Sequence, residues 1–482
     1  MRIHQFFFGA VFFLVLVFGC VGLVASPLDS SPKSFVQVSS QDNRYLALSN
    51  GKPYIPIGLN LIAPDASGGD GSAGMHQFEY WLDELSRNGG NYIRVWLSSP
   101  FWDIEHETSG VFDEAKARRI DTMLKMAHQR GIRVKMTLEH FRTLEGEGRQ
   151  RWAHKPLHHV SRGGPAKSMA DYFDGEVSRE QFKRKLAWYA KRYGNDPTIY
   201  GWELWNEINA TAAGDHLAWS EVMFRELHRL FPLNLAMQSL GSFDAPAVRD
   251  LYRAMSLLAG NDVAQVHRYL DLGAKWEVCH GPVDVLAAEA VRELLAWSPL
   301  KPVILAESGA VEPNHAGPFK LYAKDKEGML LHDILFAPFF AGAAGPGQCW
   351  HWNVYIDRNN LWHHFGRFAE TVKGLDPAAE NFIPTMVPHS RLRIYVLKGQ
   401  KTRLAWCRDR QNDWMSELEQ EKPAEVIENC RIDFAPVLGG LPLRRIQYYD
   451  PWRGMWHDGK AAEQVISLPP FSRSLVVRIE ME

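Results

Sequence analysis

Apolar residues recur along the chain in two periods. Runs of strand length lie at residues 54–60, 91–99, 132–140, 199–207, 233–241, 262–270, 301–309 and 347–355. Between these runs the spacing is helical, as in residues 76–90, where one face carries Phe78, Trp81, Leu82 and Leu85. Eight alternations of strand and helix predict an α/β fold of the (β/α)8 barrel type. No glycine-rich phosphate loop follows the first run, which argues against an open dinucleotide-binding sheet.

Different patterns precede and follow the predicted barrel. Two strand-like runs around the turn at Asn50 and Gly51 predict an N-terminal β-hairpin. The final part of the chain has strand-like runs separated by turns, which predicts a small antiparallel, β-sandwich-like C-terminal domain. We therefore expect the barrel over residues 35–385 and the β-domain over residues 386–482. The aromatic stretch at 448–459 is expected to pack against the barrel, with carbohydrate binding as the alternative.

The first residues predict export. Arg2 precedes an uncharged apolar run that extends from Phe6 to Ala25, typical of a signal peptide or a membrane anchor. Cleavage after Ala25 ranks first, lipidation at Cys20 second and retention as a spanning helix third. We expect residues 1–25 to be this leader, residues 26–34 a polar linker, and the protein to be secreted or periplasmic, with membrane attachment as the alternative.

Composition narrows the classes of partner. A hydrophobic share of 46% with 23% charged residues is ordinary for a globular protein. A net charge of -2 supplies no basic field, so we expect no nucleic acid partner. Without Cys20, the cysteines are Cys279, Cys349, Cys407 and Cys430. Their spacing suggests no metal site, and we expect buried thiols, with a Cys407–Cys430 disulfide as the alternative.

Polar and aromatic residues stand on successive predicted strands, most of them near the carboxyl end, where barrels of this type place their ligand sites. They are Asn60, Arg94, His140, Asn206, Glu207, Gln238, His267, Tyr269, Glu307, Trp350 and Trp352. Any one of them can be a hydrogen-bonded structural residue. Their recurrence at one end of the barrel indicates a functional site.

Two of these residues are carboxylates that can converge. Glu207 ends the fourth predicted strand and Glu307 ends the seventh, and these strands face each other across a closed barrel. Retaining glycoside hydrolysis needs two carboxyl groups about 5 Å apart, one as acid and base and the other as nucleophile. The tryptophans near Glu207 would keep its carboxyl protonated by excluding water. Glu203, deeper in the same strand, is expected to be a buried support that contacts Arg94.

The motif WNE at 205–207 resembles the acid/base motif of the clan A glycoside hydrolases, and AESG at 306–309 resembles their nucleophile strand. Arg94 in YIRVW, His140, HRY at 267–269 and a tryptophan in the eighth run complete the set. It is most similar to glycoside hydrolase family five, with its mannanase and cellulase-like members, over about residues 35–385.

The resemblance implies a role for each residue of the set. Glu207 would be the general acid/base, Glu307 the nucleophile, and Asn206 a hydrogen-bond partner of the sugar 2-hydroxyl. Arg94 and Tyr269 would hold Glu307 ionised. His140 and His267 would bond sugar hydroxyls or the catalytic carboxylates, and Trp350 or Trp352, weighted equally, would form an aromatic platform.

We expect no metal and no cofactor. The long segment at 141–173 is predicted to shape one side of the cleft. It contains His154, His158 and His159, but no carboxylate or cysteine accompanies them at a familiar ligand spacing.

The expected function is that of a retaining glycoside hydrolase that cleaves β-glycosidic bonds in a poly- or oligosaccharide by double displacement, with β-mannan or β-glucan favoured. An exo-acting β-galactosidase or β-mannosidase is the first alternative, because long loops after the third, sixth and seventh strands could close one end of the cleft. A non-catalytic carbohydrate-binding barrel is the second, against which both glutamates and Asn206 argue. A metal-dependent barrel hydrolase ranks lower. The sequence leaves the oligomeric state open.

Overall fold

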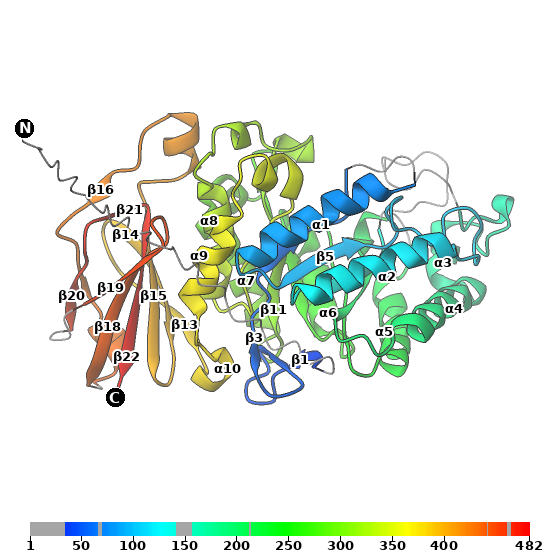
Figure 1. The fold of residues 1–482 in the computed structure, drawn as a ribbon, viewed down its shortest axis with the longest axis horizontal. Helices are drawn as coiled ribbons and strands as arrows, with labels where there is room; N and C mark the ends of the chain where they lie inside the picture. Colours follow the sequence, from blue (N-terminus) through cyan, green and yellow to red (C-terminus); the bar gives the residue numbers. More distant parts are fainter. Residues whose placement is uncertain (1–33, 66–69, 141–156, 212–213, 441, 460–463) are drawn as a thin grey trace, which may run out of the picture.

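The computed structural model describes residues 34–65, 70–140, 157–211, 214–440, 442–459 and 464–482. An α/β part, residues 34–382, is followed by a β-rich C-terminal part, residues 383–482, which lies at the left of Figure 1. The predicted leader and His154 lie outside the described residues. Within those ranges no helix has the length and apolarity needed to span a membrane.

The α/β part is built on parallel strands. A five-stranded sheet has the order β4 (Gly58–Asn60), β5 (Tyr92–Trp96), β6 (Arg133–Glu139), β7 (Ile199–Trp205) and β8 (Leu235–Met237). A second parallel pair consists of β9 (Ala264–His267) and β11 (Val303–Glu307), and a short parallel pair, β10 (Leu270–Asp271) and β12 (Ala310–Val311), continues it. All residues of β4 to β9 and β11 are buried, as expected for strands covered on both faces. Seven of the eight predicted segments thus contain a parallel strand.

Backbone hydrogen bonds beyond the paired strands link the two sheets. Asp262 N donates to Ala236 O at 2.9 Å between β9 and β8. On the other side, Gln348 N donates to Leu305 O at 2.9 Å, and Asn60 N donates to Cys349 O at 3.1 Å. The segment at 347–349 therefore lies between β11 and β4, at the place of an eighth strand.

The prediction of a strand over 347–355 is wrong beyond this bridge. Cys349 forms an isolated parallel bridge with Ser308, and a π-helical turn, Trp352–Asp357, follows. Its buried residues are Trp352, Tyr355 and Ile356. Their spacing of three and four is helical, so the apparent alternation in the preceding residues does not continue.

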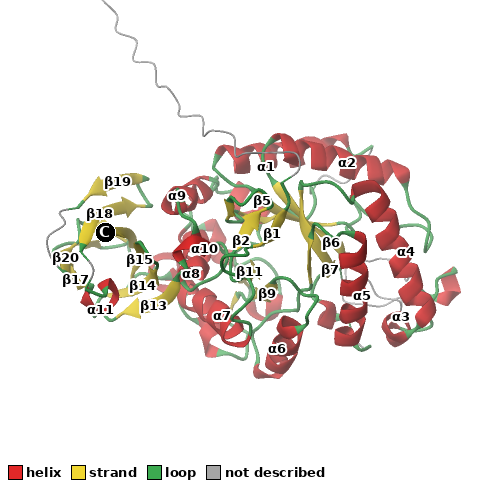
Figure 2. Ribbon diagram, turned by 90° about the horizontal axis from the view of Figure 1, so that it is seen from below, coloured by secondary structure: helices red, strands yellow, loops and turns green. Residues whose placement is uncertain are grey.

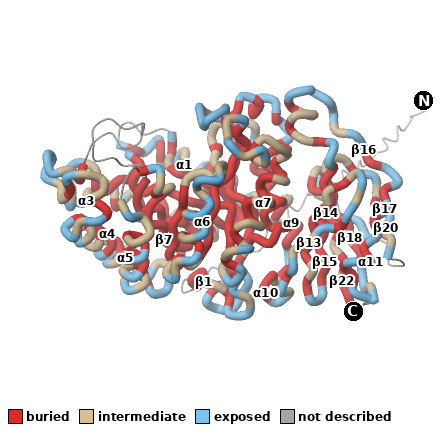
Figure 3. The backbone as a smooth tube through the Cα atoms, turned by 180° about the vertical axis from the view of Figure 1, so that it is seen from behind, coloured by how far each residue is buried: buried red, intermediate tan, exposed pale blue. Residues whose placement is uncertain are grey.

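Helices connect the strands and surround them in Figure 2. They are α1 (Ser72–Arg87), α2 (Glu114–Gln129), α3 (Met169–Asp174), α4 (Glu176–Tyr193), α5 (His216–Leu230), α6 (Arg249–Leu257), α7 (Val283–Trp297), α8 (Met329–Phe340), α9 (His363–Val372) and α10 (Pro377–Glu380). As predicted, α1 buries Phe78, Trp81, Leu82 and Leu85. Figure 3 shows the resulting contrast between buried inner strands and exposed outer loops.

A small antiparallel sheet covers the amino ends of the parallel strands. It consists of β1 (Val36–Val38), β2 (Leu46–Leu48) and β3 (Pro53–Tyr54), and the predicted turn at Gly51 joins its last two strands with a φ of 86°. Leu46 and Tyr54 pack in one cluster with Tyr92 and Ile304, which lie near the amino ends of β5 and β11. This closes one end of the strand array and leaves the carboxyl ends for a site.

The C-terminal part is antiparallel. Its main sheet has the order β13 (Ile383–Val387), β14 (Leu392–Lys398), β15 (Thr402–Asp409), β22 (Ser474–Met481), β18 (Leu443–Asp450) and β19 (Met455–Asp458). A second layer holds two short pairs and one helical turn: β16 (Val426–Ile427) with β21 (Phe471–Ser472), β17 (Arg431–Asp433) with β20 (Val465–Ser467), and α11 (Ala435–Leu438). The predicted boundary between 385 and 386 falls inside β13.

Strand alternation lets the main sheet bury both faces. On β15, Leu404 and Trp406 belong to the core of the α/β part, whereas Ala405 and Cys407 belong to a separate C-terminal core. The aromatic stretch at 448–459 also faces the α/β part, since Trp456 Nε1 donates to Glu370 Oε1 on α9 at 3.2 Å. The four cysteines beyond the leader are buried free thiols, so the alternative of a Cys407–Cys430 disulfide is not what the structure has.

Helix α8 is one of the contacts between the two parts. Every residue of its sequence MLLHDILFAPFF is buried, and in Figure 1 it stands next to the C-terminal strands. A buried ion pair crosses the junction, because Arg408 Nε on β15 donates to Asp333 Oδ1 on α8 at 2.8 Å. The C-terminal part therefore completes the burial of this helix.

Candidate active site

The structure gathers six of the nine residues predicted for the site at the carboxyl ends of the parallel strands. They are Arg94 on β5, Asn206 and Glu207 after β7, His267 on β9, Tyr269 just beyond it, and Glu307 at the end of β11. The other three, His140, Trp350 and Trp352, stand on an adjoining aromatic wall.

The two carboxylates converge across the strand array. One side-chain oxygen of Glu207 and one of Glu307 lie within 4.8 Å of each other and of a ring nitrogen of His267. His267 Nδ1 is 2.9 Å from Glu207 Oε1 and 3.4 Å from Glu307 Oε2. The Glu307 side chain is 4% exposed and the Glu207 side chain 16%. Glu307 is thus the deeper of the pair, and Glu207 is the one that reaches solvent.

Arg94 joins the carboxylates to the strands behind them. Its side chain is fully buried, and the guanidinium donates from Nη1 to Glu307 Oε1 and from Nη2 to Asn206 Oδ1, the latter at 2.5 Å. Nε donates to Glu203 Oε2 at 2.7 Å, so the contact expected between these two residues is present. One cation therefore orients three neighbouring side chains.

The surroundings of the two carboxyl groups shift their pKa values by different amounts. Burial raises the pKa of Glu207 well above its ordinary value, and the charge of Glu307 raises it further. Burial also raises the pKa of Glu307, but Arg94 and a 2.8 Å hydrogen bond from the Tyr269 hydroxyl favour its charged form. Burial and Arg94 hold the pKa of His267 well below its ordinary value. The surroundings therefore favour the proton on Glu207 over Glu307 and favour the neutral form of His267.

Glu207 is held in an uncommon backbone conformation. Its φ of 48° and ψ of 53° lie in the left-handed region, which costs a non-glycine residue about 1 kcal/mol or more. Its backbone N–H donates to Ser239 Oγ at 3.0 Å, which ties the turn to the segment after β8. This turn directs the side chain toward His267 rather than along the strand.

Asn206 presents an amide donor at the site. Its Oδ1 is occupied by Arg94, whereas its buried Nδ2 has no hydrogen-bond partner among the described residues. A buried donor without a partner is costly, and a hydroxyl of a bound ligand would satisfy it. Gln238 differs, because its Nε2 donates to the backbone oxygen of Ser239 at 2.6 Å, which is a structural role.

A cleft of about 690 Å³ lies beside Tyr269 and has aromatic walls. Trp350 is half-buried in the wall, with its ring centroid 5.0 Å from that of Trp96, and Trp96 stacks on His140 at 4.7 Å. Trp352 also lines the cleft but is only 7% exposed, packed edge-on against Trp81. Of the two tryptophans, Trp350 thus presents the more accessible surface.

His315 is a cleft residue that the sequence did not single out. Its Nδ1 lies 2.8 Å from Asp271 Oδ2 and its Nε2 lies 3.0 Å from Ser242 Oγ. Asn314 and His315 have φ values of 60° and 57°. Two successive strained residues with both ring nitrogens engaged fix the imidazole edge-on against Tyr269, at a centroid distance of 5.1 Å. In the sequence, only the long loop after the seventh predicted strand indicated a cleft wall here.

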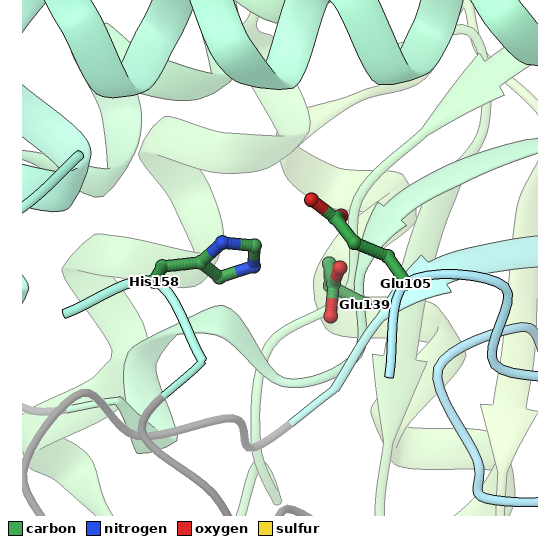
Figure 4. A group of neighbouring side chains, drawn as sticks. All are labelled: Glu105, Glu139 and His158. Atoms are coloured by element: carbon green, nitrogen blue, oxygen red, sulfur yellow. The ribbon is translucent and has the colours of Figure 1, made fainter. Parts of the chain in front are cut away.

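A second buried cluster lies behind the site. Glu105, Glu139 and His158 place one ligand atom each within 4.8 Å of one another (Figure 4). Lys185 Nζ is 3.2 Å from Glu105 Oε2 and also contacts Glu139 Oε1. The ammonium group of Lys185 thus compensates the charge of these carboxylates. The backbone oxygen of Glu139 accepts from Asn206 N at 2.7 Å, so the cluster supports the strand that carries the site.

The sequence is similar to a family model and to two curated proteins. Residues 64–230 match the family model described as Cellulase (glycosyl hydrolase family 5). Mannan endo-1,4-beta-mannosidase 3 of Oryza sativa subsp. japonica is 30% identical over 154 residues, which is 29% of this chain and 32% of that protein. Mannan endo-1,4-beta-mannosidase 4 of the same plant is 29% identical over 137 residues, 26% and 28% of the two chains. The matches thus span about a third of these relatives' length.

Solved structures are similar over more of the chain. An exo-beta-1,4-mannosidase from an Opitutaceae bacterium has a TM-score of 0.51 at 17% identity, covering 69% of this chain and 62% of that one. A putative glycoside hydrolase from Bacteroides vulgatus has a TM-score of 0.55 at 12% identity, covering 94% and 83%. These likenesses show a shared fold. The family match shows that residues 64–230 are similar to glycoside hydrolase family 5.

Proposed function

We propose that this protein is a retaining β-glycoside hydrolase that acts on β-mannan or a related β-glucan, on a closed (β/α)8 barrel. The observation that carries the proposal is the approach of Glu207 and Glu307 to within 4.8 Å. Retaining enzymes hold their carboxyl groups about 5 Å apart, whereas inverting enzymes need roughly 6.5 to 9.5 Å to admit a water molecule.

In the first half of the reaction, Glu307 attacks the anomeric carbon while Glu207 protonates the departing oxygen. The pKa order of the pair provides these two states at neutral pH, because burial and the charge of Glu307 keep the proton on Glu207. The free Nδ2 donor of Asn206 is suited to the sugar 2-hydroxyl, where hydrogen bonds strengthen in the transition state.

In the second half, the covalent bond to Glu307 is broken by water. Glu207 is then a carboxylate and removes a proton from that water. Its 16% exposed side chain reaches the solvent from which the water comes, whereas Glu307 stays covered. Tyr269 and Arg94 donate the hydrogen bonds that stabilise the negative charge when it returns to Glu307.

Mannan is the favoured substrate because the rice relatives carry mannan endo-mannosidase names. One observation favours the exo-acting alternative: His315 ties the loop after β12 to Ser242 and Asp271, beside the cleft. This bracing could close one end of the cleft. The products from a mannohexaose distinguish the modes, since an exo enzyme releases only mannose at first and an endo enzyme releases short oligosaccharides.

The direct test is hydrolysis of aryl β-glycosides and soluble β-glycans by the wild type, Glu207→Gln and Glu307→Gln. Hydrolysis by the wild type, with a β-configured first product in proton NMR and loss of turnover in both variants, supports the proposal. Unchanged activity in both variants refutes it. Glycan binding without hydrolysis by the wild type would favour a carbohydrate-binding protein instead.

We further propose that the protein is exported, because Arg2 and the apolar run to Ala25 have the pattern of an export signal. N-terminal sequencing of protein recovered from the culture medium and from membranes tests this. An intact Met1 in a cytoplasmic fraction would contradict it.

A further inference from the structure

A second charged layer lies beneath the two carboxylates. Lys135, in the middle of β6, is 1% exposed, and its Nζ is 3.6 Å from Glu203 Oε2. Nζ also donates to Gln265 Oε1, and Gln265 Nε2 donates to Glu203 Oε1 at 3.3 Å. Thr137 Oγ1 donates to Glu203 Oε2 at 2.6 Å. Glu203 is thus enclosed by donors, and Lys135 is the cation among them that does not touch the catalytic pair.

Arg94 is shared between two carboxylates. Its Nε bonds Glu203 and its Nη1 bonds Glu307, and both acids are buried. A single guanidinium cannot balance two buried negative charges, and an uncompensated buried charge is strongly unfavourable. Lys135 supplies the second positive charge. Two cations then face two anions.

The other titratable groups around Glu307 add no charge to this count. Glu207 carries a proton, burial keeps His267 neutral, and burial raises the pKa of Tyr269 well above its ordinary value. Burial lowers the pKa of Lys135 to about 7, with the Glu203 carboxylate opposing the shift. Below neutral pH Lys135 is therefore cationic.

We propose that Lys135 is a positioning residue for the nucleophile: by neutralising Glu203 it leaves the Arg94 fork available to Glu307. This inference rests on the function proposed above. Lys135 does not touch the reacting atoms, and it acts on Glu307 through Glu203 and Arg94. Without its charge, the two carboxylates compete for one guanidinium, and Glu307 takes up a proton at a higher pH.

The test is the pH profile of kcat/KM for Lys135→Met. We expect the acid limb to move up by about one pH unit, the scale expected when an opposite charge near a carboxylate is lost. Glu203→Gln removes the competing anion and should move the limb down. The double variant restores the balance and should return the limb toward the wild-type position. Lys301→Met is the control, because Lys301 Nζ bonds backbone oxygens such as that of Leu258 at 2.6 Å, outside the site.

A second measurement separates this inference from the proposed function. Carbon-13 NMR of carboxyl-labelled glutamate follows the ionisation of Glu307 without substrate, with the signal assigned by its absence in Glu307→Gln. A higher midpoint in Lys135→Met and a lower one in Glu203→Gln support the role of Lys135 even if the wild type hydrolyses nothing. An unchanged midpoint in both variants overturns it even if the wild type is active. Glu203→Gln alone still tests the sign if Lys135→Met fails to fold.

Discussion

Removal of the Tyr269 hydroxyl should raise the pKa of Glu307, the proposed nucleophile. The hydroxyl donates to Glu307 Oε2 at 2.8 Å, and Tyr269 is 4% exposed, so water cannot replace it freely. Hydrogen bonds to charged groups contribute about 1.5 to 3 kcal/mol. At about 1.4 kcal/mol per pKa unit, Tyr269→Phe raises the pKa of Glu307 by about one to two units.

The sign of the effect on activity follows from which form reacts. In the proposed mechanism only ionised Glu307 attacks, so a higher pKa removes the active form at low pH and moves the acid limb of kcat/KM upward. The assay is the pH profile on an aryl β-mannoside. Tyr193→Phe is the matched control, because its hydroxyl donates to Asp121 Oδ1 at 2.9 Å on the outer helices. An acid limb that stays at its wild-type position in Tyr269→Phe would refute the reasoning.

Three further predictions follow from the site and the core. Glu207→Gln should lower kcat on an unactivated glycan by about 10²- to 10⁴-fold. It should slow the first step far less on an aryl glycoside, because that leaving group needs no proton. Equal losses on both substrates would argue against an acid role for Glu207. Trp350→Ala should raise KM with a nearly unchanged urea midpoint, whereas Trp352→Ala should lose about 3 kcal/mol or more of stability, and the reverse pattern would contradict the assigned positions. Burial keeps the pKa of His332 well below 6.5 and lowers that of His364 to about 3. Above pH 6.5 the histidines are neutral in both the folded and the unfolded protein, so they do not lower the free energy of unfolding. Below pH 6.5 the unfolded histidines take up protons, and the free energy of unfolding should fall by up to about 1.4 kcal/mol per histidine for each pH unit. Urea unfolding between pH 8 and pH 5 tests this, and a flat dependence would contradict it.

Strand positions and the end of the array that carries the site followed from the sequence because both depend on local periodicity. Alternating strands and helices fix the direction of each strand, and this direction sets which residues reach the carboxyl ends. The depth of Glu203 relative to Glu207 predicted its contact with Arg94 for the same reason, and the structure has that contact.

The features that the sequence did not predict depend on contacts between distant segments. Lys135 lies in an ordinary-looking run, and only the register of β6 beside β7 places its ammonium by Glu203. His315 owes its position to two left-handed residues and to partners on β10 and on the loop after β8. Near Trp352, residues at helical spacing followed an alternating run, and the chain takes the helical turn because it buries Tyr355.

Charge balance links the buried layer to both halves of the proposed reaction. Before attack, the negative charges are on Glu203 and Glu307, and Arg94 and Lys135 oppose them. When Glu307 forms its bond to the sugar it loses its charge, but Glu207 becomes a carboxylate in the same step by giving up its proton. The net charge of the buried set therefore does not change. A change of one unit would cost several kcal/mol in this environment. Below neutral pH, where Lys135 is cationic, Arg94 and Lys135 can thus serve both steps without a proton leaving Lys135 or entering Glu203.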